Sequence, residues 1–131
     1  MHTGEISILV VDDVFAMLVQ LKDLLQQSGF RKISAASSGM EAVELLQADE
    51  FHVILCDWQM SPMNGLQVLQ YVRSSPKYRG TIFVMVTAES TKDKVVEAIR
   101  AGVDHYLVKP ILLDDLQHKL YQVLIKKKVL S

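Results

Sequence analysis

The sequence predicts an α/β protein built on one five-stranded parallel sheet with helices on both faces. Short apolar runs occur five times along the chain, and a segment with helical spacing of apolar residues follows each of them. Such alternation is typical of parallel strands joined by crossover helices. In addition, polar residues that suit a functional site stand directly after four of the five runs. This position favours a ligand site at one edge of the sheet.

The five predicted strands are short and largely apolar, as expected of strands that are buried on both faces. They lie at residues 6–11, 33–36, 51–56, 81–86 and 105–108. Helices are predicted at residues 15–28, 40–46, 66–73, 92–101 and 113–129. Gly29 and Gly102 are expected to end two of these helices. In the helix at 92–101, we expect Val95, Val96 and Ile99 to face inward.

The composition indicates one ordinary globular domain. The chain has 131 residues, of which 50% are hydrophobic and 22% charged,. A net charge of -1 gives no sign of a nucleic-acid surface, and no apolar run approaches the length of a membrane span,. The single cysteine, Cys56, excludes an internal disulfide and favours a reducing compartment,. We therefore expect residues 1–131 to be a single cytoplasmic domain without an output domain.

The candidate functional residues follow the predicted strands. Asp12 and Asp13 come after the first strand, Asp57 after the third, Thr87 after the fourth and Lys109 after the fifth. The carboxyl ends of parallel strands meet at one edge of the sheet, where ligands bind in open α/β proteins. We therefore expect these five side chains to converge.

The residue types in this set indicate phosphoryl transfer. Three converging carboxylates repel one another unless a cation lies between them. An incomplete set of oxygen ligands is typical of Mg²⁺, which keeps several waters and favours phosphate. The hydroxyl of Thr87 and the ammonium of Lys109 complete a pocket for an anion. A carboxylate in such a pocket can act as the nucleophile and form an aspartyl phosphate.

These residues, in this order, resemble the receiver domains of response regulators, and in particular the stand-alone receivers of the chemotaxis type. The resemblance covers essentially the whole chain. It rests on Asp12-Asp13, Asp57, Thr87-Ala88-Glu89 and Lys109-Pro110. It implies a flavodoxin-like (βα)5 fold, a doubly wound five-stranded parallel sheet with strand order 2-1-3-4-5. It also implies a cis bond between Lys109 and Pro110.

The resemblance implies a role for each acidic residue. Asp57 would accept a phosphoryl group from a histidine kinase, so that the protein is an acceptor and not an enzyme. Asp13 and Asp57 would ligate Mg²⁺ directly, Asp12 would place a bound water, and the backbone carbonyl of Gln59 would add a ligand. Gln59 and Glu89 would border the path of the water that hydrolyses the phosphate, and would thus set how long the signal lasts.

The resemblance also implies a conformational switch. Thr87 would hydrogen-bond the phosphoryl group and Lys109 would pair with it, while the ring of Tyr106 turns inward as Thr87 moves. Phosphorylation would thereby shift an inactive–active equilibrium on the face formed by the fourth helix, fifth strand and fifth helix. The partner-binding residues expected on this face are Lys92, Val95, Tyr106 and Lys119.

Two positions depart from the chemotaxis type of receiver. Phe15 stands where these receivers usually have a smaller residue, and Leu18 where they often have a basic one. The two residues are one helical turn apart. We expect both to enlarge the core, and the alternative is an apolar patch for a partner.

The sequence also bears on four alternative functions, two within the receiver family and two outside it. Within the same family, the alternatives are a receiver of a non-motility phosphorelay and a phosphorylation-independent pseudo-receiver, and the complete set of acids argues against the latter. A phosphatase of the haloacid dehalogenase type needs a second acid two residues after the nucleophile, where this chain has Gln59. An FMN carrier needs hydroxyls and glycine in its first loop, where Asp12 and Asp13 would repel the phosphate.

Overall fold

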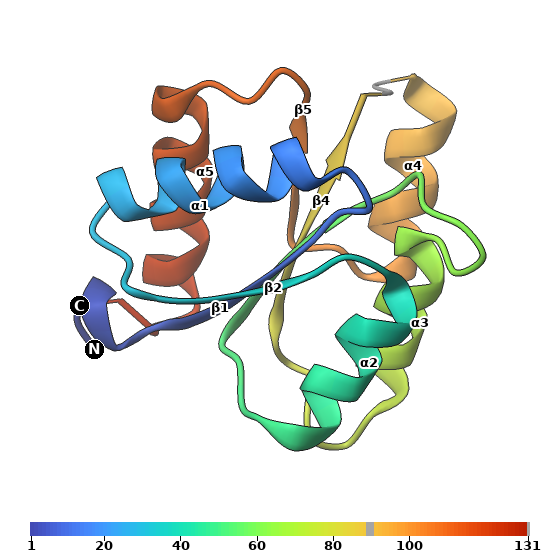
Figure 1. Ribbon diagram of the computed structural model, residues 1–131, viewed down its shortest axis with the longest axis horizontal. Helices are drawn as coiled ribbons and strands as arrows, with labels where there is room; N and C mark the ends of the chain where they lie inside the picture. The colour runs from blue at the N-terminus through green and yellow to red at the C-terminus, as the bar shows by residue number, and fades with distance from the viewer. Residues whose placement is uncertain (89–90, 131) are drawn as a thin grey trace.

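The computed structural model describes residues 1–88 and 91–130, and in them strands and helices alternate as predicted (Figure 1). The strands are β1 (Ser7–Val11), β2 (Lys32–Ala36), β3 (Val53–Asp57), β4 (Ile82–Thr87) and β5 (His105–Val108). The helices are α1 (Phe15–Gln27), α2 (Gly39–Ala48), α3 (Gly65–Ser74), α4 (Lys92–Ala101) and α5 (Leu113–Lys126), with a 3-10 turn, η1 (Thr3–Glu5), before β1. No helix of the described residues is long and apolar enough to cross a membrane.

The strands form one parallel sheet in the order β2-β1-β3-β4-β5, which confirms the predicted topology. In its centre, Val10 of β1 pairs with Ala35 of β2 and with Leu55 of β3. The chain leaves β1 toward β2 and then returns to β3 on the other side, so the strand order reverses between β1 and β3. A crevice at the carboxyl ends of these two strands is the usual ligand site of such a sheet.

The sheet separates two apolar cores. Because successive side chains of a strand point to opposite faces, each inner strand contributes to both cores. In β1, Ile8 and Val10 pack in the core covered by α1 and α5, whereas Leu9 and Val11 pack in the core covered by α2, α3 and α4 (Figure 1). Burial on both faces is therefore the reason why the strands are continuous apolar runs.

Phe15 and Leu18, the two residues that depart from the chemotaxis type of receiver, differ in burial on α1. Leu18 is only 7% exposed and belongs to the core under α1 and α5, so the prediction for Leu18 is confirmed. Phe15 is 78% exposed, so the prediction that Phe15 enlarges the core is wrong. Phe15 is the first residue of the helix and lies beside the stripe of buried leucines rather than on it. The residues of that stripe are Leu18, Leu21 and Leu25.

Helix α4 begins at a side-chain cap and ends at a glycine. The hydroxyl of Thr91 accepts a hydrogen bond from the backbone N–H of Lys94, and Gly102 takes a left-handed conformation with φ of 98°, as expected of a helix stop,. Ala98 is the buried residue of this helix, while Ile99 is 59% exposed. The prediction that Ile99 faces inward is therefore wrong, because the smaller Ala98 is the residue that lies against the neighbouring elements.

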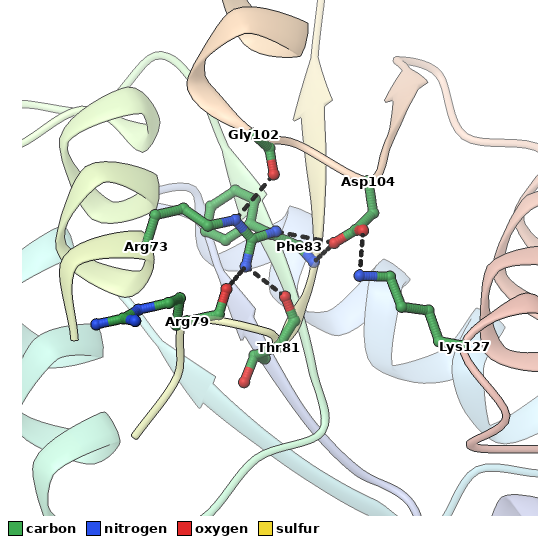
Figure 2. A network of polar contacts seen from close by, with 7 residues as sticks. All are labelled: Arg73, Arg79, Thr81, Phe83, Gly102, Asp104 and Lys127. Atoms are coloured by element: carbon green, nitrogen blue, oxygen red, sulfur yellow. Dashed lines mark hydrogen bonds and ion pairs between the residues drawn. The ribbon is translucent and has the colours of Figure 1, made fainter. Parts of the chain in front are cut away.

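At the amino-terminal edge of the sheet, the guanidinium of Arg73 joins several elements (Figure 2). Its Nε donates to the carbonyl of Gly102 at 2.9 Å, and its Nη1 donates to the carbonyls of Thr81 at 2.6 Å and Arg79 at 3.0 Å. Arg73 lies on α3, whereas its acceptors lie before β4 and at the end of α4. One side chain therefore fixes the positions of three segments.

Asp104 is the anionic partner in the same network (Figure 2). Its Oδ2 accepts hydrogen bonds from Nη2 of Arg73 at 2.9 Å and from the backbone N–H of Phe83 at 2.8 Å. Its Oδ1 lies 3.1 Å from Nζ of Lys127, beyond the end of α5. The Arg73–Asp104 network thus connects α3, β4, β5 and the C-terminal end of α5.

Candidate functional site

Three carboxylates meet at the carboxyl edge of the sheet. Asp57 is the last residue of β3, and Asp12 and Asp13 follow β1 directly. One oxygen from each of the three lies within 4.8 Å of the others. Asp12 and Asp57 are buried, whereas Asp13 is exposed. The site therefore has two negative charges with little contact to solvent and a third at its mouth.

Lys109 holds the two buried carboxylates together. Its Nζ lies 3.1 Å from Oδ2 of Asp12 and 3.2 Å from Oδ1 of Asp57. Its backbone N–H donates to the carbonyl of Thr87 at 2.8 Å, which fixes the segment after β5 to the end of β4. The Lys109–Pro110 bond is cis, as expected. The five residues predicted from the strand ends therefore do lie at one edge of the sheet.

Burial and neighbouring charges shift the pKa values of several residues at this site. Burial, followed by the negative charge of Asp12, raises the pKa of Asp57, although Lys109 and the backbone N–H of Gln59 counteract this,. Burial acts to lower the pKa of Lys109, but the hydrogen bond and charge of Asp12, together with the charge of Asp57, outweigh it, so the pKa of Lys109 is raised. Burial also raises the pKa of Cys56 well above its usual value, which favours an unreactive thiol,.

The donor set fits a hard divalent cation. All candidate ligands are carboxylate oxygens, and Lys109 supplies only one positive charge against the three negative charges of Asp12, Asp13 and Asp57. Mg²⁺ prefers oxygen ligands and commonly takes one or two carboxylates while keeping several waters. The Gln59 backbone borders this site through its hydrogen bond to Asp57. The predicted contribution of the Gln59 carbonyl as a ligand stays a prediction.

Thr87 and Tyr106 belong to a second group of side chains beside the acid site. Thr87 and Tyr106 line one small hollow together with Trp58 and Val95. Thr87 ends β4 and is buried, and Tyr106 is a half-buried residue of β5. The two predicted switch residues are therefore brought together, between the acid site and α4. Rotation of the Tyr106 ring stays a prediction.

The predicted partner-binding residues lie on neighbouring elements. Nζ of Lys119 on α5 lies 5.3 Å from the centre of the Tyr106 ring and donates to the Tyr106 carbonyl at 3.1 Å. Val95 lines the same hollow as Tyr106, and Lys92 is exposed on the first turn of α4. Glu89, which was expected to affect the signal lifetime, lies outside the described residues.

Sequence reasoning did not find two residues beside the acid site, Trp58 and Lys94. Nζ of Lys94 lies 4.8 Å from the centre of the Trp58 ring. Both residues line an open hollow together with Asp13, Gln59 and Asn64. The signal for Trp58 was its place directly after Asp57, but no pattern in the sequence brings Lys94 of α4 to the end of β3.

Replacement of Asp57 by asparagine should stabilise the protein at neutral pH. The pKa of Asp57 is raised above its ordinary value of 3.8, so its ionised form is less favourable in the folded protein than in the unfolded chain,. The folded state therefore loses stability as pH rises from 3.8 through the raised pKa, and the loss is complete above it,. We expect Asp57→Asn to be more stable by roughly 1 kcal/mol at pH 7 without divalent cations.

Urea unfolding between pH 4 and pH 7 in the presence of a chelator measures this difference, which should shrink toward the acidic end. Asp23→Asn is the matched control, because Asp23 is exposed on α1 and, within the described residues, its side chain accepts a hydrogen bond only from the side chain of Gln27. Equal or lower stability of Asp57→Asn at neutral pH would contradict the prediction.

Comparison with known proteins gives a consistent picture. Residues 8–121 match the family model of the response regulator receiver domain. The chain is 40% identical over 119 residues to the chemotaxis protein CheY homolog of Campylobacter jejuni, covering 90% of this chain and 92% of that protein. It is 35% identical over 117 residues to the chemotaxis protein CheY of Pseudomonas aeruginosa, covering 89% and 94%. The structure of the chemotaxis response regulator CheY4 of Vibrio cholerae superposes with a TM-score of 0.84 at 30% identity, covering 90% and 98%.

Proposed function

Because this chain belongs to the family of response regulator receiver domains, we propose that it carries a signal by accepting a phosphoryl group on Asp57. The observation that supports this most is the buried Asp57 carboxylate, which clusters with the acids Asp12 and Asp13 and lies 3.2 Å from Nζ of Lys109. The donor in this proposal is a histidine kinase. The protein acts as an acceptor that slowly hydrolyses its own aspartyl phosphate, and not as an enzyme with a separate substrate.

The proposed transfer requires an oxygen of Asp57 to attack the phosphorus of the donor. A new P–O bond forms while the bond to the donor's leaving group breaks, and the leaving group keeps the electron pair. Lys109 already contacts the attacking carboxylate at 3.2 Å and neutralises part of the charge on the phosphoryl oxygens,. The hydroxyl of Thr87 hydrogen-bonds one of these oxygens. Asp13 and Asp57, together with Asp12, would hold a Mg²⁺ ion, which would supply further charge neutralisation,.

The proposed output is a change on the face formed by α4, β5 and α5. Recruitment of Thr87 by the phosphoryl group opens room next to Tyr106, since both residues line the same hollow. Inward rotation of the Tyr106 ring then changes the surface presented together with Lys92, Val95 and Lys119 to a protein partner. The relatives named as chemotaxis proteins favour a chemotaxis-type partner over another phosphorelay.

Incubation with acetyl phosphate, with and without Mg²⁺, tests the proposed function when the intact mass is measured. We expect one phosphoryl adduct that requires Mg²⁺ and is absent from Asp57→Asn. Asp23→Asn should be labelled like the wild type, because Asp23 is an exposed residue on α1 away from the strand ends. No adduct on the wild type, or an adduct that remains on Asp57→Asn, would contradict the proposal and favour a pseudo-receiver.

A further inference from the structure

Lys94 lies at the boundary between the acid site and the switch hollow. It lines the open hollow of Asp13 and Gln59 and also the small hollow of Thr87 and Tyr106. The other side chain common to both hollows is that of Trp58, over which Nζ of Lys94 lies. Lys94 is therefore the cation of α4 that shares a hollow with Asp13, one of the three clustered acids, on the side of the site that Trp58 occupies.

The ammonium group of Lys94 interacts only weakly with its neighbour, the aromatic ring of Trp58. Among residues 1–88 and 91–130, Lys94 forms no ion pair, and its ammonium lies over the Trp58 ring. A lysine over an aromatic ring at an accessible site gains only a small stabilisation. A hydrogen bond in which both groups are charged is roughly twice as strong as one between neutral groups. An anion in the shared hollow is therefore a better partner for Lys94 than the ring.

Lys109 and Lys94 reach the site from different sides. Lys109 follows β5 and contacts the buried acids Asp12 and Asp57. Lys94 belongs to α4, on the face of the sheet opposite α1 and α5 (Figure 1), and lines the hollow that contains the exposed Asp13. The lysine side chain is long and flexible, so its ammonium can move from the ring toward an anion seated in that hollow.

We propose that Lys94 is a second cationic contact for the phosphoryl group, first on the anionic donor and then on phosphorylated Asp57, and that it leaves the Trp58 ring to make this contact. This inference rests on the proposed function. It also links the site to the output face, because Lys94 lies in the first turn of α4 beside Val95, which lines the hollow of Tyr106.

The test compares three variants with the wild type for the rate of phosphorylation by acetyl phosphate in Mg²⁺. Lys94→Met removes the charge and keeps the length of the side chain, and Lys94→Arg keeps the charge. Arg100→Met is the control for the loss of charge, since Arg100 is an exposed residue in the last turn of the same helix and lines a separate hollow with Asp93 and Glu97. All three chains are expected to fold, because Arg100 is exposed and the Thr91 cap bonds only the backbone N–H of residue 94.

We expect Lys94→Met to react about threefold to tenfold more slowly at low donor concentration, with a weaker dependence on ionic strength. The substitution should act mainly by raising the concentration of acetyl phosphate that gives the half-maximal rate. Lys94→Arg should recover most of the rate, and Arg100→Met should stay within about twofold of the wild type. Both methionine variants lose one positive charge. A difference between their phosphorylation rates therefore shows that the position of the cation matters, and not only the net charge of the protein.

A second readout is independent of the reaction rate. Trp58 is the only tryptophan of the chain, so its emission reports the cation above its ring. We expect phosphorylation to change this emission in the wild type and to change it much less in Lys94→Met. Equal rates in Lys94→Met and Arg100→Met would overturn the inference while leaving the proposed function intact. A wild type that takes no phosphoryl group in Mg²⁺ would overturn both.

Discussion

Replacement of Gly65 by alanine should destabilise the protein by about 3 kcal/mol, because the added methyl group has no space. A Cβ at this position would lie against the carbonyl oxygen of Asp57, 2.8 Å from Cα of Trp58 and 3.0 Å from the carbonyl carbon of Asp57. These are backbone atoms, which cannot rotate away as a flexible side chain would. The backbone N–H of Gly65 also donates to the carbonyl of Trp58 at 2.8 Å, so the two segments are held in contact.

The Gly65→Ala substitution should also impair phosphorylation, since relief of the clash moves the backbone that carries Asp57. A displacement of about 1 Å can cost a factor of 100 in rate. Urea unfolding followed by circular dichroism measures the stability, and labelling by acetyl phosphate measures the rate.

Gly80→Ala is the control for the glycine substitution. An alanine Cβ at Gly80 meets no atom within 4 Å, and its φ lies outside the left-handed region. We expect Gly80→Ala to be neutral or slightly stabilising, because it restricts the unfolded chain. Similar stabilities of Gly65→Ala and Gly80→Ala would show that the contact between α3 and the end of β3 is not as close as described.

Replacement of Asp104 by alanine should lower the free energy of unfolding by about 2–3 kcal/mol. The change leaves the guanidinium of Arg73 without its anionic partner and the backbone N–H of Phe83 without its acceptor. The side chains of Arg73 and Asp104 are 21% and 13% exposed, so water replaces these contacts only in part. Urea unfolding of the variant measures the loss.

Asp115→Ala is the control for the loss of an acidic side chain. Asp115 pairs with Lys119 at 3.5 Å across one turn of α5 and is 43% exposed, so its ion pair is a solvated one. We expect its removal to cost less than about 0.5 kcal/mol. If Asp104→Ala were no more costly than Asp115→Ala, the Arg73–Asp104 network would not be the structural junction that its geometry indicates.

The sequence predicted the strands and the site well because both depend on local patterns. A strand buried on both faces must be a continuous apolar run, and a residue directly after such a run must lie at the carboxyl edge. This reasoning places Asp12, Asp57 and Thr87 correctly at the carboxyl edge of the sheet. The order of the strands came from the resemblance to receiver domains, because the apolar pattern of a strand does not identify its neighbours.

The wrong predictions concern helix faces and contacts between distant elements. Phe15 and Ile99 are apolar residues at helical spacing, but their burial depends on whether another element covers that part of the helix, and here none does so fully. The contact of Lys94 with Trp58 depends on how α4 lies against the end of β3. No single segment of sequence carries that information.

The alternation of side chains along the strands limits how a chain of this kind can diverge. In β3, Val53 and Leu55 face one core, and Ile54 and Cys56 face the other. Insertion or deletion of one residue within the strand would exchange the two sets and turn Asp57 away from Lys109. Changes in length are therefore confined to the loops, and within the strands variation has to proceed by substitution alone.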